Sequence, residues 1–315
     1  MTRRTEQVTV LAGGVGAARF LRGLSSLLDP RCLTVIVNTG DDETFFGLHV
    51  SPDVDTILYT LAGVVAPAQG WGIADDTFNC LARLDRVYDE TWFQLGDADL
   101  ATHIFRTDAL RKGHTLTMVT REIARAYGVR VNVLPMSDAP VRTFVQVAGR
   151  GPLPFQRYLV QGRGRGRVER ITLRGAQRAH PAPGTREAVR RAQYIIIPPS
   201  NPLVSIGPIL ALRGMRQALR QTNARVAAVT PLIGKAPVKG PLHRMLKGLG
   251  HEVSPVGVAR LYRSIADIFV LDRRDAALAP RITALGMRPV VADTLMTTPA
   301  KSRHLAQTVL AELRR

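Results

Sequence analysis

The feature that most limits how this chain can fold is a glycine-rich turn near its N-terminus. The short apolar run Val8–Ala12 leads directly into Gly13-Gly14-Val15-Gly16. Large apolar residues then recur at helical spacing from Ala17 to Leu28, and Leu33–Val37 is a second β-type run. A strand, a turn, a helix and a strand in this order predict the opening of a parallel sheet with a right-handed crossover.

The rest of the chain continues this alternation. Helical spacing runs from Pro52 to about Gly63, and residues 70–130 have a mostly helical pattern. Further strands are expected at 129–134, 141–147, 157–161, 195–198, 224–230 and 269–272, and a last helix at 302–313 with Ser302 as its N-cap. We predict one α/β domain over residues 1–315, with a Rossmann-like three-layer fold, a mainly parallel sheet, and a helical layer inserted at about 70–130.

The formal net charge of +18 allows two explanations. An anionic partner would account for it, and so would a general preference for arginine, because only five of the 43 basic residues are lysines. Aromatic residues make up 5% of the chain and are not interleaved with basic ones, as a surface for single-stranded nucleic acid would require. We therefore expect no nucleic-acid partner.

Three further features concern the compartment. The segment Met1–Gln7 is polar and lacks the apolar run of a signal peptide. No apolar stretch is long enough to span a bilayer. The two cysteines, Cys32 and Cys80, form neither a disulfide framework nor a cluster of metal ligands. These features predict a cytoplasmic protein without membrane contact.

The turn Gly13–Gly16 is a candidate anion site, because backbone N–H groups at glycines and at a helix N-terminus can approach a phosphate closely. The dinucleotide-binding fingerprint fits badly, since Arg19 occupies its third glycine position, and this argues against an NAD-dependent dehydrogenase. No Gly-Lys-Ser/Thr follows, so the Walker phosphate loop does not fit either. A tight turn without a ligand is the simpler alternative.

Carboxylates gather after the second strand. Asp41 and Asp42 follow it directly, and Asp53 and Asp55 come a short loop later. Both segments are expected at the carboxyl edge of the sheet, where oxygen ligands beside phosphates suit Mg²⁺. We predict Asp41, Asp42 and Asp53 as metal ligands, and Asp55 or Asp42 as the group that orients or deprotonates an attacking hydroxyl. An ordinary helix N-cap at Ser51 or Asp53 is the alternative for that segment.

Two later turns carry further polar groups. Ser200 and Asn201 follow the strand expected at 195–198, and Ser205 stands before the next helix. Hydroxyl, amide and free backbone N–H groups at such a turn can form a second phosphate cradle, although a capped helix start would look the same. Lys239 and Gly240 follow the strand expected at 224–230 and are candidates for nucleotide contacts.

As a set, these segments resemble the 2-phospho-L-lactate transferase family of coenzyme F420 biosynthesis. The likeness covers nearly the whole chain and is highly specific in combination. It is carried by Ala12–Gly16, Val37–Asp42, Val50–Thr56, Leu95-Gly96-Asp97, Asp99–His103, Leu134–Asp138, Phe155-Gln156, Pro199–Pro202, Ser205–Pro208, Lys239–Pro241 and Ala292–Met296.

The resemblance implies a Mg²⁺-dependent transfer of a small phospho-acid from its guanosine diphosphate conjugate to the ribityl hydroxyl of 7,8-didemethyl-8-hydroxy-5-deazariboflavin, with release of GMP. It places the donor at Gly13, Gly14, Val15, Gly16, Ser200, Asn201, Ser205, Lys239 and Gly240. It places the deazaflavin acceptor at Asn38, Asp55, Gln94, His103 and Thr107, with the inserted helical layer contributing to this acceptor site. It also suggests a homodimer.

The identity of the acid and one alternative function stay open. Gln94, Arg157 and Lys235 stand where relatives have a basic residue, an acidic residue and a glycine, so phospholactate, phosphoenolpyruvate and 3-phosphoglycerate all remain candidates. A regulatory nucleotide-sugar-binding protein of the gluconeogenesis-factor type would share the glycine loop and an Asp-Asp pair. The segment Glu43–Leu48 favours the transferase, because that other family typically has glycines and serines there.

Overall fold

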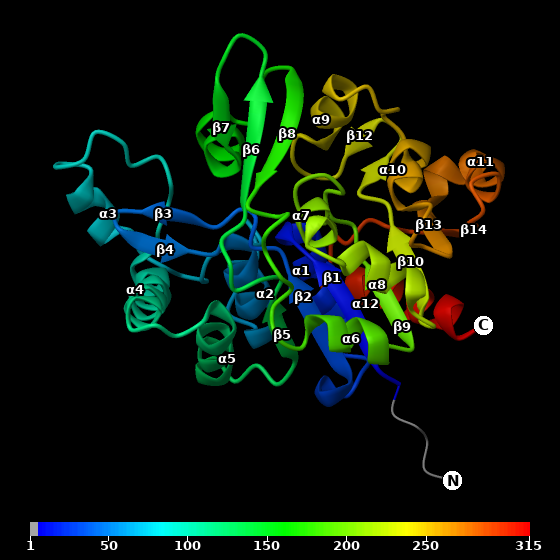
Figure 1. Ribbon diagram of the computed structural model, residues 1–315, viewed down its shortest axis with the longest axis horizontal. Coiled ribbons are helices and arrows are strands. Elements are labelled where there is room, and N and C mark those ends of the chain that lie inside the picture. Colours follow the sequence, from blue (N-terminus) through cyan, green and yellow to red (C-terminus); the bar gives the residue numbers. More distant parts are fainter. Residues whose placement is uncertain (1–5) are drawn as a thin grey trace.

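The computed structural model describes residues 6–315, so most of the polar segment Met1–Gln7 lies outside the described residues. A seven-stranded sheet forms the centre of the molecule, and all of its neighbouring strands are parallel (Figure 1). The strand order is β14 (Arg288–Ala292), β13 (Ile268–Asp272), β10 (Arg225–Val229), β9 (Tyr194–Ile197), β1 (Val8–Ala12), β2 (Leu33–Val37) and β5 (Asn132–Pro135). The predicted α/β class with a mainly parallel sheet is confirmed.

Alternate residues of the strands pack into two separate cores, one on each face of the sheet. Val10 and Val35 belong to one core, and their neighbours Leu11 and Ile36 belong to the other. Helices α1 (Gly14–Ser25), α2 (Pro52–Ala62), α5 (Leu116–Ala126) and α12 (Pro299–Arg314) cover the first face. Helices α6 (Thr185–Arg191), α7 (Gly207–Ala211), α8 (Met215–Gln221), α9 (Leu242–Gly248), α10 (Pro255–Tyr262) and α11 (Ala279–Thr283) cover the second. This is the three-layer arrangement expected for strands that are apolar on both sides.

The inserted layer is helical mainly in its second half. Beside the sheet lie α4 (Asp97–Arg111) and α5, whereas residues 63–96 form a loop with one short helix, α3 (Asn79–Leu84) (Figure 1). Asp76 accepts hydrogen bonds from the first N–H groups of α4, and Asp97 accepts them from those of α3. The expectation of a mostly helical segment from residue 70 is therefore wrong for its first part: α3 begins only at Asn79 and α4 at Asp97, and these two carboxylates bind the N–H groups that a helix start leaves free.

Three small antiparallel sheets lie outside the main one, and sequence patterns predicted only β6 among their strands. They are the hairpin β3 (Glu43–Phe45) with β4 (Leu48–Val50), the pair β11 (Leu232–Ile233) with β12 (Ala236–Pro237), and a three-stranded sheet of β7 (Pro152–Pro154), β6 (Arg142–Val147) and β8 (Val168–Arg174). The strands of the two pairs span only two or three residues, too short for a periodic signal. In β8 the alternation is masked by exposed charged residues.

The strand expected at 157–161 is wrong. Residues Arg157–Gln161 form η2, one turn of π-helix, in which Tyr158 is buried and its hydroxyl donates to the carbonyl of Gly164 over 2.9 Å. Of two short 3₁₀ turns, η1 (Pro30–Cys32) directly precedes β2 and η3 (Arg273–Leu278) directly follows β13. The β-forming residues at 157–161 therefore lie in a helical turn, where Tyr158 is buried, and they do not pair with a strand of residues 6–315.

The terminal helix starts earlier than expected. Thr298, not Ser302, is the N-cap of α12, and its hydroxyl accepts a hydrogen bond from the N–H of Lys301 over 3.2 Å. Ser302 is buried inside the helix and donates to the carbonyl of Thr298. Across residues 6–315, no helix combines the length and the apolar character that crossing a membrane would need.

The contact between α1 and α12 gives a stability prediction. A Cβ added to Gly23 would clash with the backbone of Ser302 and Arg303. In an open helix, Gly→Ala stabilises by up to about 1 kcal/mol. Here we expect Gly23→Ala to lower the free energy of unfolding by about 1–3 kcal/mol, because the two helices must move apart.

Urea unfolding measures this effect. Gly151→Ala is the control, because a Cβ on Gly151 meets no atom within 4 Å. We expect it to change the free energy of unfolding by less than about 0.5 kcal/mol. A Gly23→Ala variant more stable than the parent chain would contradict the close approach of the two helices.

Candidate functional site

One cavity of about 640 Å³ lies at the carboxyl ends of the central strands. Its wall is built by the segments that follow β1, β2, β9 and β10, together with α2 and the loop 63–96. A cavity in this position is the usual ligand site of an open parallel sheet, and its volume is that of a small-molecule pocket. This cavity is therefore the candidate functional site.

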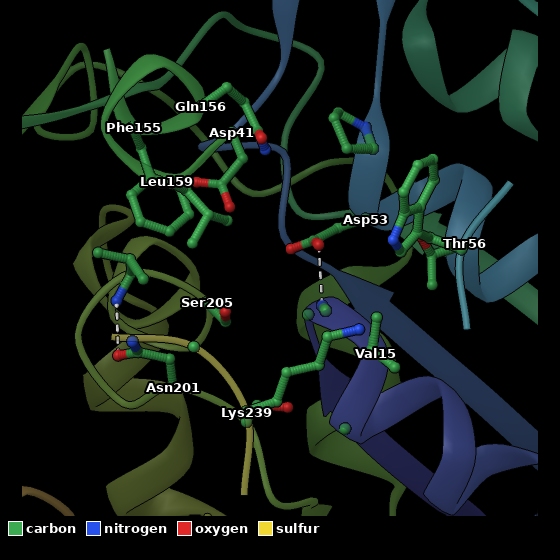
Figure 2. Close-up of a pocket in the computed structure, with 18 of the residues that line it drawn as sticks. Val15, Asp41, Asp53, Thr56, Phe155, Gln156, Leu159, Asn201, Ser205 and Lys239 are labelled. Atoms are coloured by element: carbon green, nitrogen blue, oxygen red, sulfur yellow. Dashed lines mark hydrogen bonds between the residues drawn. The ribbon is translucent and has the colours of Figure 1, made fainter. Parts of the chain in front are cut away.

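The glycine turn forms the floor of the cavity and is fastened by Asp53. Helix α1 already begins at Gly14, whose φ of +72° is in the left-handed region that favours glycine. Its N–H donates to Asp53 Oδ1 over 2.8 Å (Figure 2). Asn38 Nδ2 donates to Asp53 Oδ2 over 2.8 Å. A Cβ on Gly13 would lie 2.8 Å from Asp53 Oδ2, so the carboxylate can approach only a glycine at this position.

The loop after β9 closes against the same turn. A Cβ on Gly16 would clash with the carbonyl oxygen of Pro199, so the two loops are in backbone contact. Ser200, Asn201 and Ser205 line the cavity beside them. The hydroxyl of Ser200 is buried and has no hydrogen-bond partner within residues 6–315, which leaves it available to a ligand. The structure thus brings together all the residues that the sequence assigned to the donor, which also include Lys239 and Gly240.

Three of the four predicted aspartates line the cavity, and the carboxyl groups of two of them, Asp41 and Asp53, are strongly perturbed by burial. Burial, together with the neighbouring charges of Asp53 and Asp42, raises the pKa of Asp41 well above its usual value. One oxygen of Asp41, Oδ1, is buried and has no hydrogen-bond partner in the described part of the chain. Burial also raises the pKa of Asp53 to about 6, against the opposing hydrogen bonds from Asn38 and Gly14. A cation between the two groups would relieve both perturbations.

Asp42 does not line the cavity, contrary to its predicted role as a metal ligand or base. Its Oδ2 accepts a hydrogen bond from Ser51 Oγ over 2.7 Å and lies 3.0 Å from Nε2 of His49. Within residues 6–315 there is no cluster of three or more His, Cys, Asp or Glu side chains placed to hold a metal ion. Asp55 and Asp99 also line the cavity but are bound by Arg106, Tyr59 and His103, which leaves Asp41 and Asp53 as a pair of carboxylates. Such a pair fits Mg²⁺, since this ion uses one or two carboxylates and completes its shell with water and phosphate.

Asp55 lines the cavity but is held by a residue that the sequence analysis did not identify. The guanidinium of Arg106, on α4, donates to both oxygens of Asp55, and this arginine side chain is fully buried. His103 adds its Nδ1 at 3.7 Å from Asp55 Oδ2. Burial raises the pKa of Asp55, and the charges of Arg106 and His103 oppose that shift. The only sequence signal for Arg106 was its place one helical turn after His103 in a polar stretch of the insertion.

The predicted acceptor residues divide into two groups. Gln94, His103 and Asp55 line the cavity, whereas Asn38 and Thr107 lie behind its wall. Asn38 holds Asp53, as described above. The hydroxyl of Thr107 accepts a hydrogen bond from the N–H of His49 over 2.8 Å and donates to the carbonyl of His103 over 2.6 Å. The structure therefore gives Asn38 and Thr107 a supporting position rather than one in contact with a ligand.

An aromatic wall completes the cavity, and sequence reasoning missed most of it. Trp71, Trp92, Phe93 and Phe155 all line it. Phe45 of the β3–β4 hairpin stacks on Phe93 with ring centroids 3.9 Å apart and meets Trp92 edge-on at 5.3 Å. Aromatic side chains that line a cavity suit a flat, conjugated ligand, because their rings can pack against it. Aromatic residues are rare in this chain, and the adjacent pair Trp92-Phe93 was for that reason the only sequence signal of an aromatic site.

The comparisons with known proteins agree with this geometry. A model of the 2-phospho-L-lactate transferase CofD family matches residues 8–310. The 2-phospho-L-lactate transferase of Methanosarcina mazei is 40% identical over 301 residues, which cover 96% of this chain and 98% of the relative. The phosphoenolpyruvate transferase of Streptomyces griseus is 41% identical over 309 residues, which cover 96% of this chain and 97% of the relative.

A solved structure shares the fold. A protein member of the UPF0052 family from Bacillus halodurans matches 98% of this chain and 99% of its own length, with a TM-score of 0.66. Its sequence identity is only 16%, so the likeness concerns the fold alone. By contrast, both relatives named above, which match in sequence, are transferases by name. They do not favour the alternative of a regulatory nucleotide-sugar-binding protein.

The raised pKa of Asp53 predicts how stability depends on pH in metal-free protein. The pKa of Asp53 is higher in the folded state than its unfolded value of 3.8, so its carboxyl group contributes most to the free energy of unfolding below pH 3.8. This contribution is lost as the pH rises through about 6. Asp53→Asn removes the titration. The stability of the variant relative to the parent chain should therefore rise between pH 4 and pH 7 by up to about 3 kcal/mol.

Chemical denaturation of metal-free protein at several pH values tests this. Asp108→Asn is the control, because Asp108 also lies in an ordered helix but is 57% exposed. Its stability relative to the parent chain should stay level over the same range. If the stability of Asp53→Asn relative to the parent chain also stayed constant between pH 4 and pH 7, the raised pKa of Asp53 would be contradicted.

Proposed function

This chain belongs to the 2-phospho-L-lactate transferase CofD family, and on that premise we propose that it transfers a small phospho-acid from a guanosine diphosphate conjugate to the ribityl hydroxyl of 7,8-didemethyl-8-hydroxy-5-deazariboflavin. The observation that carries the proposal is one cavity with two chemically different walls. Glycine amides and carboxylates at its floor suit a metal-bound diphosphate, and the aromatic wall suits the deazaflavin rings. The reaction would be a step of coenzyme F420 biosynthesis.

The phosphate end of the cavity would bind the donor with Mg²⁺. Asp41 and Asp53 are the residues that would hold the ion. Both face the cavity, and burial destabilises the negative charge of each carboxylate, which a bound cation would offset. When bound, the ion would neutralise charge on the diphosphate and on the leaving GMP. The first-turn N–H groups of α1 and the free hydroxyl of Ser200 would bind the remaining phosphate oxygens.

Asp55 is suited to orient the acceptor hydroxyl. Its two oxygens already accept hydrogen bonds from Arg106, which fixes the carboxylate in the cavity wall, yet each oxygen keeps a lone pair for another donor. The hydroxyl oxygen would form a bond to the phosphorus that bears the small acid. The bond from this phosphorus to the bridging oxygen breaks, GMP leaves with the electron pair, and the hydroxyl loses its proton to a carboxylate of the cavity.

Several finer points belong to the proposal. The relatives bear the names of 2-phospho-L-lactate and phosphoenolpyruvate transferases, and 3-phosphoglycerate remains a third candidate acid. We expect the enzyme to act in the cytoplasm, where the free Cys32 and Cys80 would stay reduced, and to form a homodimer. We expect neither nucleic acid nor membrane among its partners.

GMP release tests the reaction. Purified protein with Mg²⁺ and the deazaflavin alcohol is mixed with the guanosine diphosphate conjugate of phospholactate, phosphoenolpyruvate or 3-phosphoglycerate, each in turn. We expect GMP and a deazaflavin product carrying the matching acid, identified by mass spectrometry, with at least one donor. The regulatory alternative predicts binding of a nucleotide sugar and no GMP with any of the three, and that result would reject the transferase proposal.

The role of Asp55 gives a second prediction. In Asp55→Asn the side chain keeps its size but loses the charge that faces the hydroxyl, so turnover should fall by about 100-fold or more. The dissociation constant of the donor, measured by calorimetry, should change by less than about threefold, because the phosphate contacts are elsewhere. Thermal melting of the variant controls for its loss of the ion pair with Arg106. Equal losses in turnover and in donor affinity would speak against this role.

A further inference from the structure

Two cationic side chains of the cavity wall have no acidic partner. Arg19, in the second turn of α1, and Lys239, in the loop before α9, both line the cavity. Neither forms an ion pair with any Asp or Glu among residues 6–315. The carboxylates on the wall are engaged elsewhere or lie at the other end: Asp53 with Gly14 and Asn38, Asp55 with Arg106, Asp99 with Tyr59 and His103, and Asp41 beside Gln156.

Both cations lie beside the same turn of the loop 63–96. Lys239 Nζ donates a hydrogen bond to the carbonyl of Gln69 over 2.8 Å. The position that a Cβ would take on Gly70 lies 3.8 Å from Nε and from Nη2 of Arg19. Burial, and then repulsion from Arg19, lower the pKa of Lys239. Two neighbouring cations without a counter-charge are unfavourable, so the pair is prepared for an anion.

The pair lies a short way from the phosphate end of the cavity. Arg19 follows Val15 by four residues on α1, which corresponds to about 6 Å along the helix axis. Figure 2 shows Lys239 extending across the lower part of the cavity toward Val15, while Asp41 and Asp53 lie above. An anion between Arg19 and Lys239 would therefore be a second charged group of a ligand whose phosphates rest on the glycine turn.

The chemistry of the donor indicates which group this is. Beyond its diphosphate, the nucleoside end of the conjugate is uncharged, whereas the phospho-acid end bears a carboxylate a few bonds from the reacting phosphorus. An arginine fork and a lysine are the side chains best suited to hold a carboxylate. We therefore infer that Arg19 and Lys239 form a subsite for the carboxylate of the transferred acid, an inference that rests on the proposed function.

Such a subsite would do two things. It would require a free carboxylate on the transferred group, a property that all three candidate acids share, and so it would favour the conjugate over its carboxamide. It would also fix the acid end of the conjugate, so that the phosphorus is turned toward the hydroxyl held at Asp55. Arg19, which occupies the third glycine position of the dinucleotide fingerprint, would thus bind the carboxylate of the transferred acid.

Calorimetry without the acceptor tests the subsite. Three ligands are titrated into the protein with Mg²⁺: the guanosine diphosphate conjugate of phospholactate, its carboxamide, and guanosine diphosphate. We expect Arg19→Gln and Lys239→Met each to weaken binding of the conjugate by about 10- to 100-fold. The other two ligands should lose less than about threefold. Arg22→Gln, on the same helix, and Lys235→Met, in the neighbouring turn between β11 and β12, are matched controls, because neither residue lines the cavity.

The outcomes separate this inference from the proposed function. Equal weakening of all three ligands would assign the cations to the phosphates or the guanine, and unchanged binding of the conjugate would leave them no role; either result overturns the subsite. If Arg19→Gln does not fold, Arg19→Lys keeps a charge without the fork and should weaken the conjugate alone by several-fold. GMP release by the parent chain is measured in parallel, and its absence would reject the proposed function itself.

Discussion

The carboxylate of Asp53 is the interaction on which the arrangement of the site depends. Its two oxygens bind the N–H of Gly14 and the amide of Asn38, so it joins the start of α1, the end of β2 and the first turn of α2. These hydrogen bonds compensate only part of the free energy that burying the group costs, which is why its pKa stays high. The fold thus keeps a buried negative charge beside the glycine turn, which a cation bound there would stabilise.

A second carboxylate on the same helix attaches the inserted layer. Asp53 and Asp55 are two residues apart on α2, so they point in different directions: one toward the glycine turn and the other toward α4. The pair of Asp55 with the fully buried Arg106 is costly to separate, because either charge alone would be left without compensation in the interior. The glycine turn and α4 are therefore held in a fixed relation by one turn of α2.

The charges of the cavity are segregated rather than mixed. In the view of Figure 2, Asp41 and Asp53 lie above Lys239, and Lys239 and Arg19 both lie beside the turn at Gln69 and Gly70. A ligand that carries a metal-bound diphosphate and a separate anionic group would match both ends at once. The net charge of +18 is a different matter, since only a few of the 43 basic side chains line the cavity, and a general preference for arginine accounts for the others.

The sequence by itself determined the class of fold, because apolar runs and helical spacing are local patterns that burial on a sheet requires. It also located the glycine turn and the aspartates, whose spacing relative to strand ends places them at the carboxyl edge. Only the tertiary structure decided which aspartates face the cavity: Asp42 turns away because Ser51 and His49 bind it, although it adjoins Asp41 in the chain. The same holds for Arg106 and for Trp92, whose positions depend on contacts with residues about 50 positions away, and no local pattern encodes such contacts.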